Sequence, residues 1–288
     1  MRYRFLAFPG GKQKAVTFSY DDGVSQDVRL SELFLKYGMK ATFNINSGLF
    51  GEKGNNSTRL TAEEIRKNIV DRGHEIAVHG VHHIASAVAS PTLCLKDAFE
   101  CRRALEDEFD MIIRGMAYPD SGIRVQANQN DYETVKNILT YSGIVYSRTL
   151  GGDNNSFAMP LDFHAWMPTA HHNNPELFTW IEEFNSLSYD EARAKNNKPR
   201  LMYIWGHSYE FDIKDNWDRI EEICSRLSGK EDVWYATNIE IADYVCAYES
   251  LIFSADETKV HNPTATTVWF TADTKMYKLL PGETKKLD

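Results

Sequence analysis

Short apolar runs alternate with longer amphipathic runs along most of the sequence, and this alternation limits what the chain can fold into. Runs rich in β-branched and aromatic residues predict strands at 14–20, 40–46, 74–79, 112–118, 144–147, 163–167, 201–205 and 233–236. Stretches with helical spacing predict helices at 26–37, 61–71, 91–108, 131–141, 176–186, 217–227 and 239–248. Strands joined through helices run parallel, and seven or eight such units close most easily into a barrel. We therefore predict an α/β fold of the (β/α)7–8 barrel class.

The character of the sequence changes beyond residue 250. Residues 251–288 are rich in Thr, Val and Lys, and apolar and polar residues alternate around 268–270 and 276–280, which predicts a short C-terminal β extension. So few residues make only a marginal core by themselves. We therefore expect this small β appendage to pack on a barrel formed by residues 1–250.

The charge balance bears on the partners that the chain can have. The formal net charge is -9, the sequence pI is near 5.5, and no cluster of Lys and Arg offers a stripe for phosphates. These features exclude a nucleic-acid partner and favour a neutral substrate. Aromatic residues make up 12% of the chain, which suits the binding of sugar rings, although most of these rings are expected in the core.

Cysteine usage and the distribution of apolar residues bear on the compartment. Cys94, Cys101, Cys224 and Cys246 lack CxxC spacing and are expected to be reduced thiols that behave as small hydrophobes. The segment before Pro9 is too short for the apolar region of a signal peptide, and no stretch approaches a membrane span. The sequence predicts a soluble protein without a membrane span, cytoplasmic unless an export signal has been removed from it.

Polar clusters follow the same end of several predicted strands. They are Asp21 and Asp22, Asn44 and Asn46, residues 79–83, residues 118–120, and His207. In a parallel barrel the carboxyl ends of the strands form the active-site face. Five clusters at that face indicate one shared site rather than five unrelated turns.

Asp21 and Asp22 are adjacent carboxylates that repel each other unless they share a cation or a proton. An Asp-Asp-Gly turn, in which one side chain caps the next segment, is the alternative. His79 and His83 are four residues apart, so one helical turn places both imidazoles on the same side while His82 points elsewhere. Two histidine nitrogens and one carboxylate oxygen leave a position open for water, as a catalytic Zn²⁺ site requires. The second aspartate can then act as general base.

His207 follows the apolar run 201–205 and is the natural general acid, because a leaving amine or alkoxide needs a proton. A histidine hydrogen-bonded within a loop is an alternative of about equal weight. Three other histidines are interpreted as solvated loop residues rather than as part of the cleft: His164, His171 and His172. The choice of substrate is assigned to the loops 48–57, 150–160 and 168–175.

The segment TFSYDDG, residues 17–23, resembles the first motif of the polysaccharide deacetylases of carbohydrate esterase family 4, the NodB-homology family. The resemblance implies that Asp21 is the catalytic base and that Asp22 binds the metal. His79 and His83 resemble the metal pair of the family's second motif, and His207 resembles the acid histidine of its last motif. The resemblance covers about residues 14–245. It implies a distorted, incomplete (β/α) barrel that removes acetyl groups from carbohydrate with a divalent metal, commonly zinc, with cobalt or nickel as alternatives.

Two motifs depart from the pattern of the family. The third, usually Arg-x-Pro-Tyr, corresponds best to the segment GMAYPDSG, where Ala117 stands near the arginine position and Asp120 near the aromatic one. Arg148, at the end of the next predicted strand, is the candidate to replace the arginine as the residue that orients Asp21. A backbone N–H of Tyr118 or Asp120 is the candidate to stabilise the oxyanion, because such a donor does not depend on the side chain.

The fourth motif, an Asp shortly before a Trp, is resembled by Asp162 and Trp166. These two residues and Asn46 are candidates for substrate binding, and simple packing is the alternative for Trp166. The sequence thus predicts a metal-dependent hydrolase that acts on an N- or O-acetylated carbohydrate. Two alternatives stay open: hydrolysis of a cyclic amide C–N bond on the same barrel, and a catalytically weak carbohydrate-binding protein, for which the missing arginine is the reason.

Overall fold

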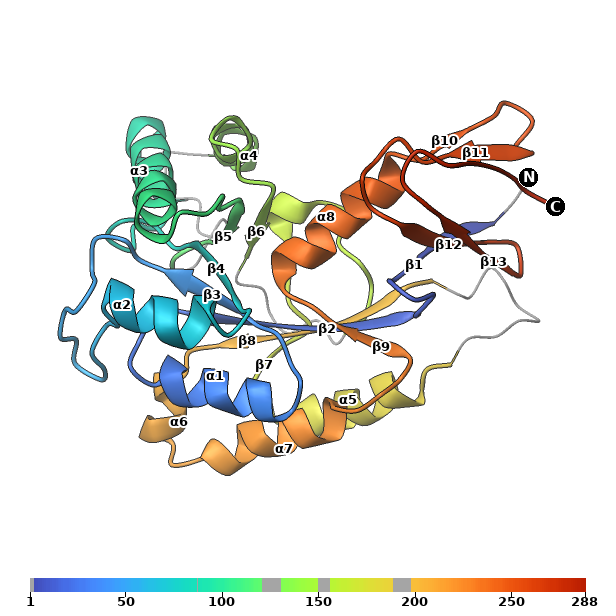
Figure 1. Ribbon diagram of the computed structural model, residues 1–288. Coiled ribbons are helices and arrows are strands. Elements are labelled where there is room, and N and C mark those ends of the chain that lie inside the picture. Colours follow the sequence, from blue (N-terminus) through green and yellow to red (C-terminus); the bar gives the residue numbers. More distant parts are fainter. Residues whose placement is uncertain (1–2, 87, 121–130, 150–155, 189–197) are drawn as a thin grey trace.

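The structure, a computed structural model, describes residues 3–86, 88–120, 131–149, 156–188 and 198–288. Its centre is a curled parallel sheet with the strand order β6-β5-β4-β3-β2-β8-β7, and β9 pairs with β2 beside this path (Figure 1). The strands are β2 Lys14–Asp21, β3 Thr42–Ile45, β4 Glu75–Val78, β5 Gly115–Ala117, β6 Tyr146–Arg148, β7 Ala170–His171, β8 Arg200–Gly206 and β9 Val233–Tyr235. The predicted distorted α/β barrel is confirmed.

Helices cover the outer face of this sheet. They are α1 Asp27–Lys36, α2 Ala62–Ile65, α3 Pro91–Phe109, α4 Tyr132–Tyr141, α5 Leu177–Ser186, α6 Tyr209–Ile213 and α7 Trp217–Leu227, whereas α8 Asn238–Glu249 packs at the end of the barrel. Val16, Phe18 and Tyr20 are alternate residues of β2 that pack into this outer layer, where Phe18 lies 4.7 Å from Phe34 of α1 between ring centroids. Among the described helices, none has both the length and the apolar character needed to cross a bilayer.

The intervening residues of β2 point into the barrel, and those beyond Ala15 are polar. They are Thr17, Ser19 and Asp21. Asn44 of β3 donates to Ser19 Oγ at 2.8 Å. Barrels of this class are usually filled with Val, Ile and Leu. A hydrogen-bonded network therefore replaces part of the usual apolar filling directly below the carboxyl ends of the strands.

The start of α8 closes the amino-terminal end of the barrel. Asn238, its first residue, accepts a hydrogen bond from Thr17 Oγ1 at 2.8 Å and donates to Tyr203 Oη at 2.5 Å. Beside it, Glu75 of β4 accepts a hydrogen bond from Tyr146 Oη at 2.6 Å. Burial raises the pKa of Glu75 to about 7, because its charged form has lost most of its water. This end of the barrel is therefore polar and dry.

The predicted strand 163–167 is wrong. Residues Phe163–Ala165 form a short 3-10 helix instead, in which Asp162 Oδ1 accepts the N–H of His164 at 2.9 Å. An Asp that bonds the backbone two residues further on favours a turn over a strand, whatever the apolar character of the residues that follow. The short strand β7 pairs with β8 in its place.

The segments beyond α8 form two small antiparallel sheets. One contains β10 Ile252–Phe253, β11 Lys259–His261 and β14 Thr284–Lys286, and the other contains β1 Arg4–Ala7, β12 Val268–Ala272 and β13 Lys275–Leu279. The sequence analysis does not predict β1, which brings the N-terminal segment into this part of the molecule. Tyr244 of α8 joins it to the barrel, because its hydroxyl donates to Ala7 O at 2.8 Å and accepts the N–H of Trp269 at 2.9 Å.

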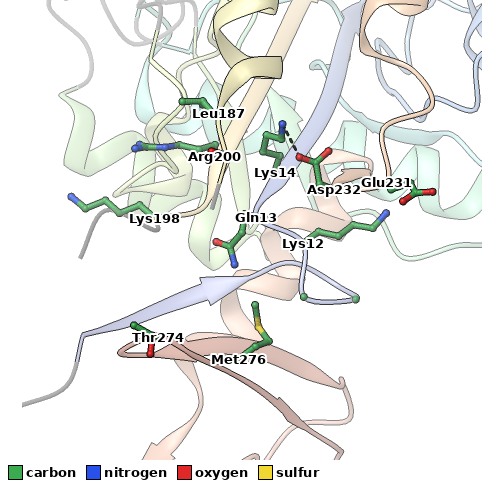
Figure 2. A pocket seen from close by; sticks show the side chains of 13 residues that line it. Lys12, Gln13, Lys14, Leu187, Lys198, Arg200, Glu231, Asp232, Thr274 and Met276 are labelled. Atoms are coloured by element: carbon green, nitrogen blue, oxygen red, sulfur yellow. Dashed lines mark ion pairs between the residues drawn. The ribbon is translucent and has the colours of Figure 1, made fainter. Parts of the chain in front are cut away.

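A cavity of about 760 Å³ lies between the amino-terminal ends of β2 and β8 and the hairpin of β12 and β13 (Figure 2). Gln13 and Arg200 contribute to the wall formed by the barrel, and Met276 contributes to the wall formed by the hairpin. On the barrel side, Lys14 pairs with Asp232 at 2.8 Å. The predicted polar clusters follow the carboxyl ends of the strands, so this cavity lies at the opposite end of the barrel from them.

Candidate active site

The carboxyl ends of four strands bring the predicted charged residues together. Asp21 and Asp22 come from β2, His79 and His83 follow β4, Arg148 ends β6, and His207 follows β8. His79 Nε2 and His83 Nε2 lie 3.8 and 3.6 Å from Asp22 Oδ1. His207 Nε2 lies 3.8 Å from Asp21 Oδ2. The two aspartates therefore face different partners.

The backbone at the end of β2 explains how adjacent aspartates serve one site. In a continuing strand their side chains would point to opposite faces of the sheet. Asp22 has a φ of +88° and Gly23 a φ of +62°, so the chain leaves the strand through two left-handed residues. A Cβ atom at Gly23 would also lie 2.9 Å from Cδ1 of Ile45. Both the dihedral angle and the close approach of Ile45 therefore require glycine at position 23.

The tautomer of His79 prepares it as a metal ligand. Its Nδ1 lies 2.9 Å from the carbonyl oxygen of Ala117, and because a carbonyl can only accept, the ring proton is on Nδ1. The lone pair of Nε2 is then free on the side of Asp22. This nitrogen is buried and has no hydrogen-bond partner among the described residues. A buried nitrogen of this kind is unfavourable without a partner, so Asp22, His79 and His83 fit a divalent cation with a further position left open.

Arg59, which the sequence analysis does not single out, contacts the same aspartate. Its Nη1 forms an ion pair with Asp22 Oδ1 at 2.9 Å and also donates to the main-chain oxygen of Asp22. The residue comes from the segment before α2, which is bridged to Val24. Its sequence position gives no signal of this contact, because the contact depends on how that segment folds back over β2.

Both carboxylate oxygens of Asp21 are held in place. Arg148 Nη2 donates to Oδ2 at 2.5 Å, and Asn44 Nδ2 donates to Oδ1 at 2.8 Å. Burial alone would raise the pKa of Asp21, but the positive charge of Arg148, together with that of His207, lowers it to about 2. Asp21 is therefore ionised and oriented at neutral pH. Asn44 is one of the polar residues that the sequence analysis places at the ends of strands. It lies two residues from Asn46, so both side chains are expected on the same face of the strand, toward the inside of the barrel.

His207 is held by Glu210, a residue that the sequence analysis missed. His207 Nδ1 donates to Glu210 Oε1 at 2.9 Å, which leaves Nε2 on the side of Asp21. Burial alone would lower the pKa of His207, but the hydrogen bond to Glu210 and the charges of Asp21 and Asp22 raise it. A raised pKa keeps a proton on the ring near neutral pH. The spacing of three between the two residues was an available signal, since it places them on one side of a helical turn.

Glu210 also lies close to the histidines at the end of β7. His171 Nε2 lies 3.3 Å from Oε1 and His172 Nε2 lies 3.4 Å from Oε2 of this carboxylate, the latter without a well-formed hydrogen bond. The N–H of Asn173 donates to His171 Nδ1 at 3.1 Å, so the ring proton of His171 is on Nε2 and faces Glu210. His171, His207 and Glu210 lie close enough together to hold a metal ion. However, the protonated Nε2 of His171 has no lone pair for a metal, so these residues form a hydrogen-bonded cluster.

The prediction of solvated loop histidines is wrong. His172 is fully buried and stacks on Tyr20 and Phe211, with ring centroids 5.6 and 4.2 Å apart. This burial lowers its pKa to about 4. His164 is also buried, with Nδ1 3.3 Å from Ser147 Oγ, and His171 is half-buried. Their partners come from distant parts of the chain, so polar neighbours in the sequence gave a misleading signal.

The two candidates for an oxyanion donor differ in the structure. The N–H of Tyr118 donates to the carbonyl oxygen of Arg148 at 3.0 Å, so it is already used inside the sheet and this candidate is wrong. Asp120 is left-handed, with a φ of +52°, and no acceptor among the described residues takes its N–H. Its carboxylate lies 3.7 Å from His83 Nδ1, at the metal ligands. Asp120 therefore remains the candidate donor.

Structural partners engage the three residues predicted to bind substrate. Asn46 is buried, and its amide donates to main-chain carbonyls after β4. Asp162 pairs with Lys136 of α4 at 2.7 Å. Trp166 is buried against aromatic rings, including that of Tyr203 at 5.0 Å between centroids. The surroundings of Trp166 thus agree with the alternative that it packs in the core.

Comparisons with known proteins agree with this architecture. The family model for polysaccharide deacetylase matches residues 9–135, and a search among curated proteins gave no match. A Mycobacterium smegmatis protein assigned to the polysaccharide deacetylases is 18% identical, with a TM-score of 0.56, over 86% of this chain and 96% of that one. Puue allantoinase is 14% identical, also with a TM-score of 0.56, over 82% of this chain and 91% of that one.

A third structure matches a shorter part of the chain. Streptococcus pyogenes deacetylase PplD in complex with acetate is 22% identical, with a TM-score of 0.40, over 46% of this chain and 55% of that one. The alignment thus spans about half of that protein. The match to the polysaccharide deacetylase model spans residues 9–135, less than half of the chain, and the acidic turn and the HxxxH pair lie inside it.

Proposed function

We propose that the protein is a metal-dependent hydrolase that removes N- or O-linked acetyl groups from a carbohydrate. One observation carries the proposal: the free lone pair of His79 Nε2 lies 3.8 Å from the Asp22 carboxylate, next to Asp21, whose two oxygens are held by Asn44 and Arg148. In this arrangement the two adjacent aspartates have different tasks: Asp22 would bind the cation, and Asp21 would act as the base. The acidic balance of the sequence agrees with an uncharged carbohydrate as substrate.

The protein's own groups divide the work of hydrolysis. A divalent cation held by Asp22, His79 and His83, with Zn²⁺ favoured by this ligand set, would lower the pKa of a water and polarise the acyl oxygen. Asp21 accepts the proton of the attacking water, since it is ionised and fixed. The N–H of Asp120 would donate to the oxyanion. His207 gives its Nε2 proton to the leaving amine or alkoxide, while Glu210 holds Nδ1.

Asp21→Asn is the variant that tests this division. It should keep the bound metal, because Asp22 and both histidines remain, and it should lose about 10²–10⁴-fold of the rate of acetate release. N-acetylglucosamine oligomers and acetylated xylan are the substrates to compare, because they separate N-acetyl from O-acetyl groups. Asp22→Asn is the matched control, and it should lose the metal as well. Full activity of the Asp21→Asn protein would exclude Asp21 as the base.

Hydrolysis of a cyclic amide is the second candidate function. The fold match to Puue allantoinase equals that to the Mycobacterium smegmatis protein in TM-score, and the charged groups of the site do not select the acyl compound. Release of product from a panel of cyclic amides, measured beside acetate release, separates the two reactions. A weak carbohydrate-binding protein was considered because the motif arginine is missing. The contact between Arg148 and Asp21 removes that reason.

A further inference from the structure

Both candidate histidine ligands come from one short loop, residues 79–83, which we call the metal loop. It connects β4 to the segment before α3. His79 and His83 can present Nε2 to the same point only if the backbone between them keeps one conformation, and a loop of this length that contains glycine would lose much conformational entropy on ordering. We propose that Asp97, on α3, is a positioning residue that fixes the metal loop for cation binding. This inference rests on the cation site of the proposed function.

Asp97 binds the backbone of the metal loop directly. Its Oδ1 accepts the N–H of Val81 at 3.0 Å. The side chain is mostly buried. A carboxylate that accepts a main-chain N–H group forms a hydrogen bond stronger than one between neutral groups. The middle residue between the histidine ligands is therefore tied to α3.

The conformation of Gly80 provides a second, independent sign of this close contact. Gly80 has a φ of +76°, and a Cβ atom built on it would lie 2.3 Å from Oδ2 of Asp97. The carboxylate thus occupies the space that any other residue's side chain would need. The loop reaches Asp97 only because position 80 carries no side chain.

Residues around the end of β3 hold the opposite side of the metal loop. Asn46 Nδ2 donates to the carbonyl oxygen of Gly80 at 3.3 Å and to that of His79. The N–H of Gly48 donates to the carbonyl oxygen of Val81 at 3.0 Å, and a Cβ atom at Gly48 would lie 2.7 Å from Cγ1 of Val81. The metal loop is therefore clamped between β3 and α3, and Asp97 is the charged member of this clamp.

Loss of Asp97 should act on the cation without touching a ligand. The side chains of Asp22, His79 and His83 would remain, but the N–H of Val81 would lose its acceptor. Groups that orient metal ligands typically change metal affinity by about 10–100-fold when they are replaced. We expect Asp97→Ala to weaken Zn²⁺ and Co²⁺ binding by that amount, and Asp97→Asn to weaken it less, since its amide oxygen still accepts one N–H group.

The test measures metal dissociation constants by competition with a chelator, with the visible spectrum of the Co²⁺ form as a second readout. Asp107→Ala is the matched control, because Asp107 lies on the same helix but is exposed and pairs only weakly with Arg103 at 3.8 Å. It should bind metal as the unchanged protein does. Asp97→Asn keeps the volume of the side chain and so guards against a failure of Asp97→Ala to fold.

A double variant adds a check on geometry. Gly80→Ala should weaken metal binding strongly in the unchanged protein and less so when combined with Asp97→Ala, since the clash with the carboxylate is then gone. Metal affinity within twofold of the unchanged protein in both Asp97 variants would overturn the inference, and so would a failure of the unchanged protein to bind a divalent cation. Tight metal binding without release of acetate would instead count against the proposed function alone.

Discussion

Arg148 Nη2 donates to Oδ2 of Asp21 at 2.5 Å, and at most 3% of either side chain is exposed. The two residues end different strands, β6 and β2, and are 127 positions apart. A buried guanidinium thus stands beside the buried carboxylate of Asp21. This contact gives a physical reason why Asp21 stays ionised inside a dry barrel.

Arg148→Ala should raise the pKa of Asp21, because the charge that favours its carboxylate form is removed while burial, which disfavours that form, remains. The acid limb of the pH profile of kcat/KM should move to higher pH, and the rate at its plateau should fall by about 10²-fold as Asp21 loses its fixed position. Arg114→Ala, which breaks an ion pair with Asp243 on the outer surface, is the control. If the Arg148 variant keeps the original rate and pH profile, Arg148 does not orient the base.

Glu210→Gln should lower the pKa of His207, because a neutral amide no longer favours the protonated ring. His207, which must be protonated to act as the general acid, would then lose its proton at a lower pH. We expect the alkaline limb of the kcat/KM profile to move down in pH, and the NMR titration of His207 to move with it. Glu222→Gln, on the exposed side of α7, is the control. An NMR titration that does not move would contradict the role of Glu210.

Glu75→Gln should make stability less dependent on pH. The pKa of Glu75 is raised from 4.5 to about 7, so the folded state holds its proton more tightly than the unfolded chain does. The stabilisation from this proton is fully present below about pH 4.5 and is lost as the pH rises to about 7, with an upper limit of about 3 kcal/mol. Burial raises the pKa of Asp27 to about 7 as well, so part of the slope should persist in the variant.

Urea unfolding at pH 5 and at pH 7.5 measures this difference. Between these values the free energy of unfolding of the unchanged protein should carry a falling contribution from Glu75, and the Gln variant should lack it. Glu249→Gln, at the exposed end of α8, should leave the slope unchanged. An equal slope in the Glu75 variant would show that this carboxyl group is already ionised at low pH.

Zn²⁺ should stabilise the protein through Asp22. A ligand present at about 100 times its dissociation constant adds about 2.7 kcal/mol to the free energy of unfolding. The melting temperature should therefore rise on addition of Zn²⁺ and return after treatment with a chelator. Asp22→Ala should abolish this rise, whereas Asp21→Asn should keep it. A rise of equal size in the Asp22 variant would place the cation elsewhere on the protein.

Local sequence patterns predicted the fold and the principal residues because both depend on strands. Alternation along β2 marks Thr17, Ser19 and Asp21 as one face, and the ends of parallel strands must meet at one edge. Arg148 was a candidate because the resembled third motif lacks its arginine and because Arg148 ends the next predicted strand, and its role stays a prediction. No knowledge of side-chain packing was needed for these predictions.

The remaining features depend on contacts that no local pattern contains. Arg59 reaches Asp22 only through the fold of its segment, and His172 is buried by rings from β2 and α6. The strand predicted at 163–167 failed because Asp162 bonds the backbone and stabilises a turn. Tyr118 was a reasonable oxyanion candidate until the pairing of β5 with β6 fixed its N–H.

Because this barrel has a polar interior, its stability and its catalysis depend on different faces of the strands. Outward residues of β2 such as Phe18 supply apolar burial against the helices, whereas inward residues such as Ser19 and Asn44 hold Asp21 in place. Substitutions on the outer face should change how much folded protein a cell accumulates, and substitutions on the inner face should change turnover. An engineer could therefore raise the thermal tolerance of this barrel from outside without redesigning its chemistry.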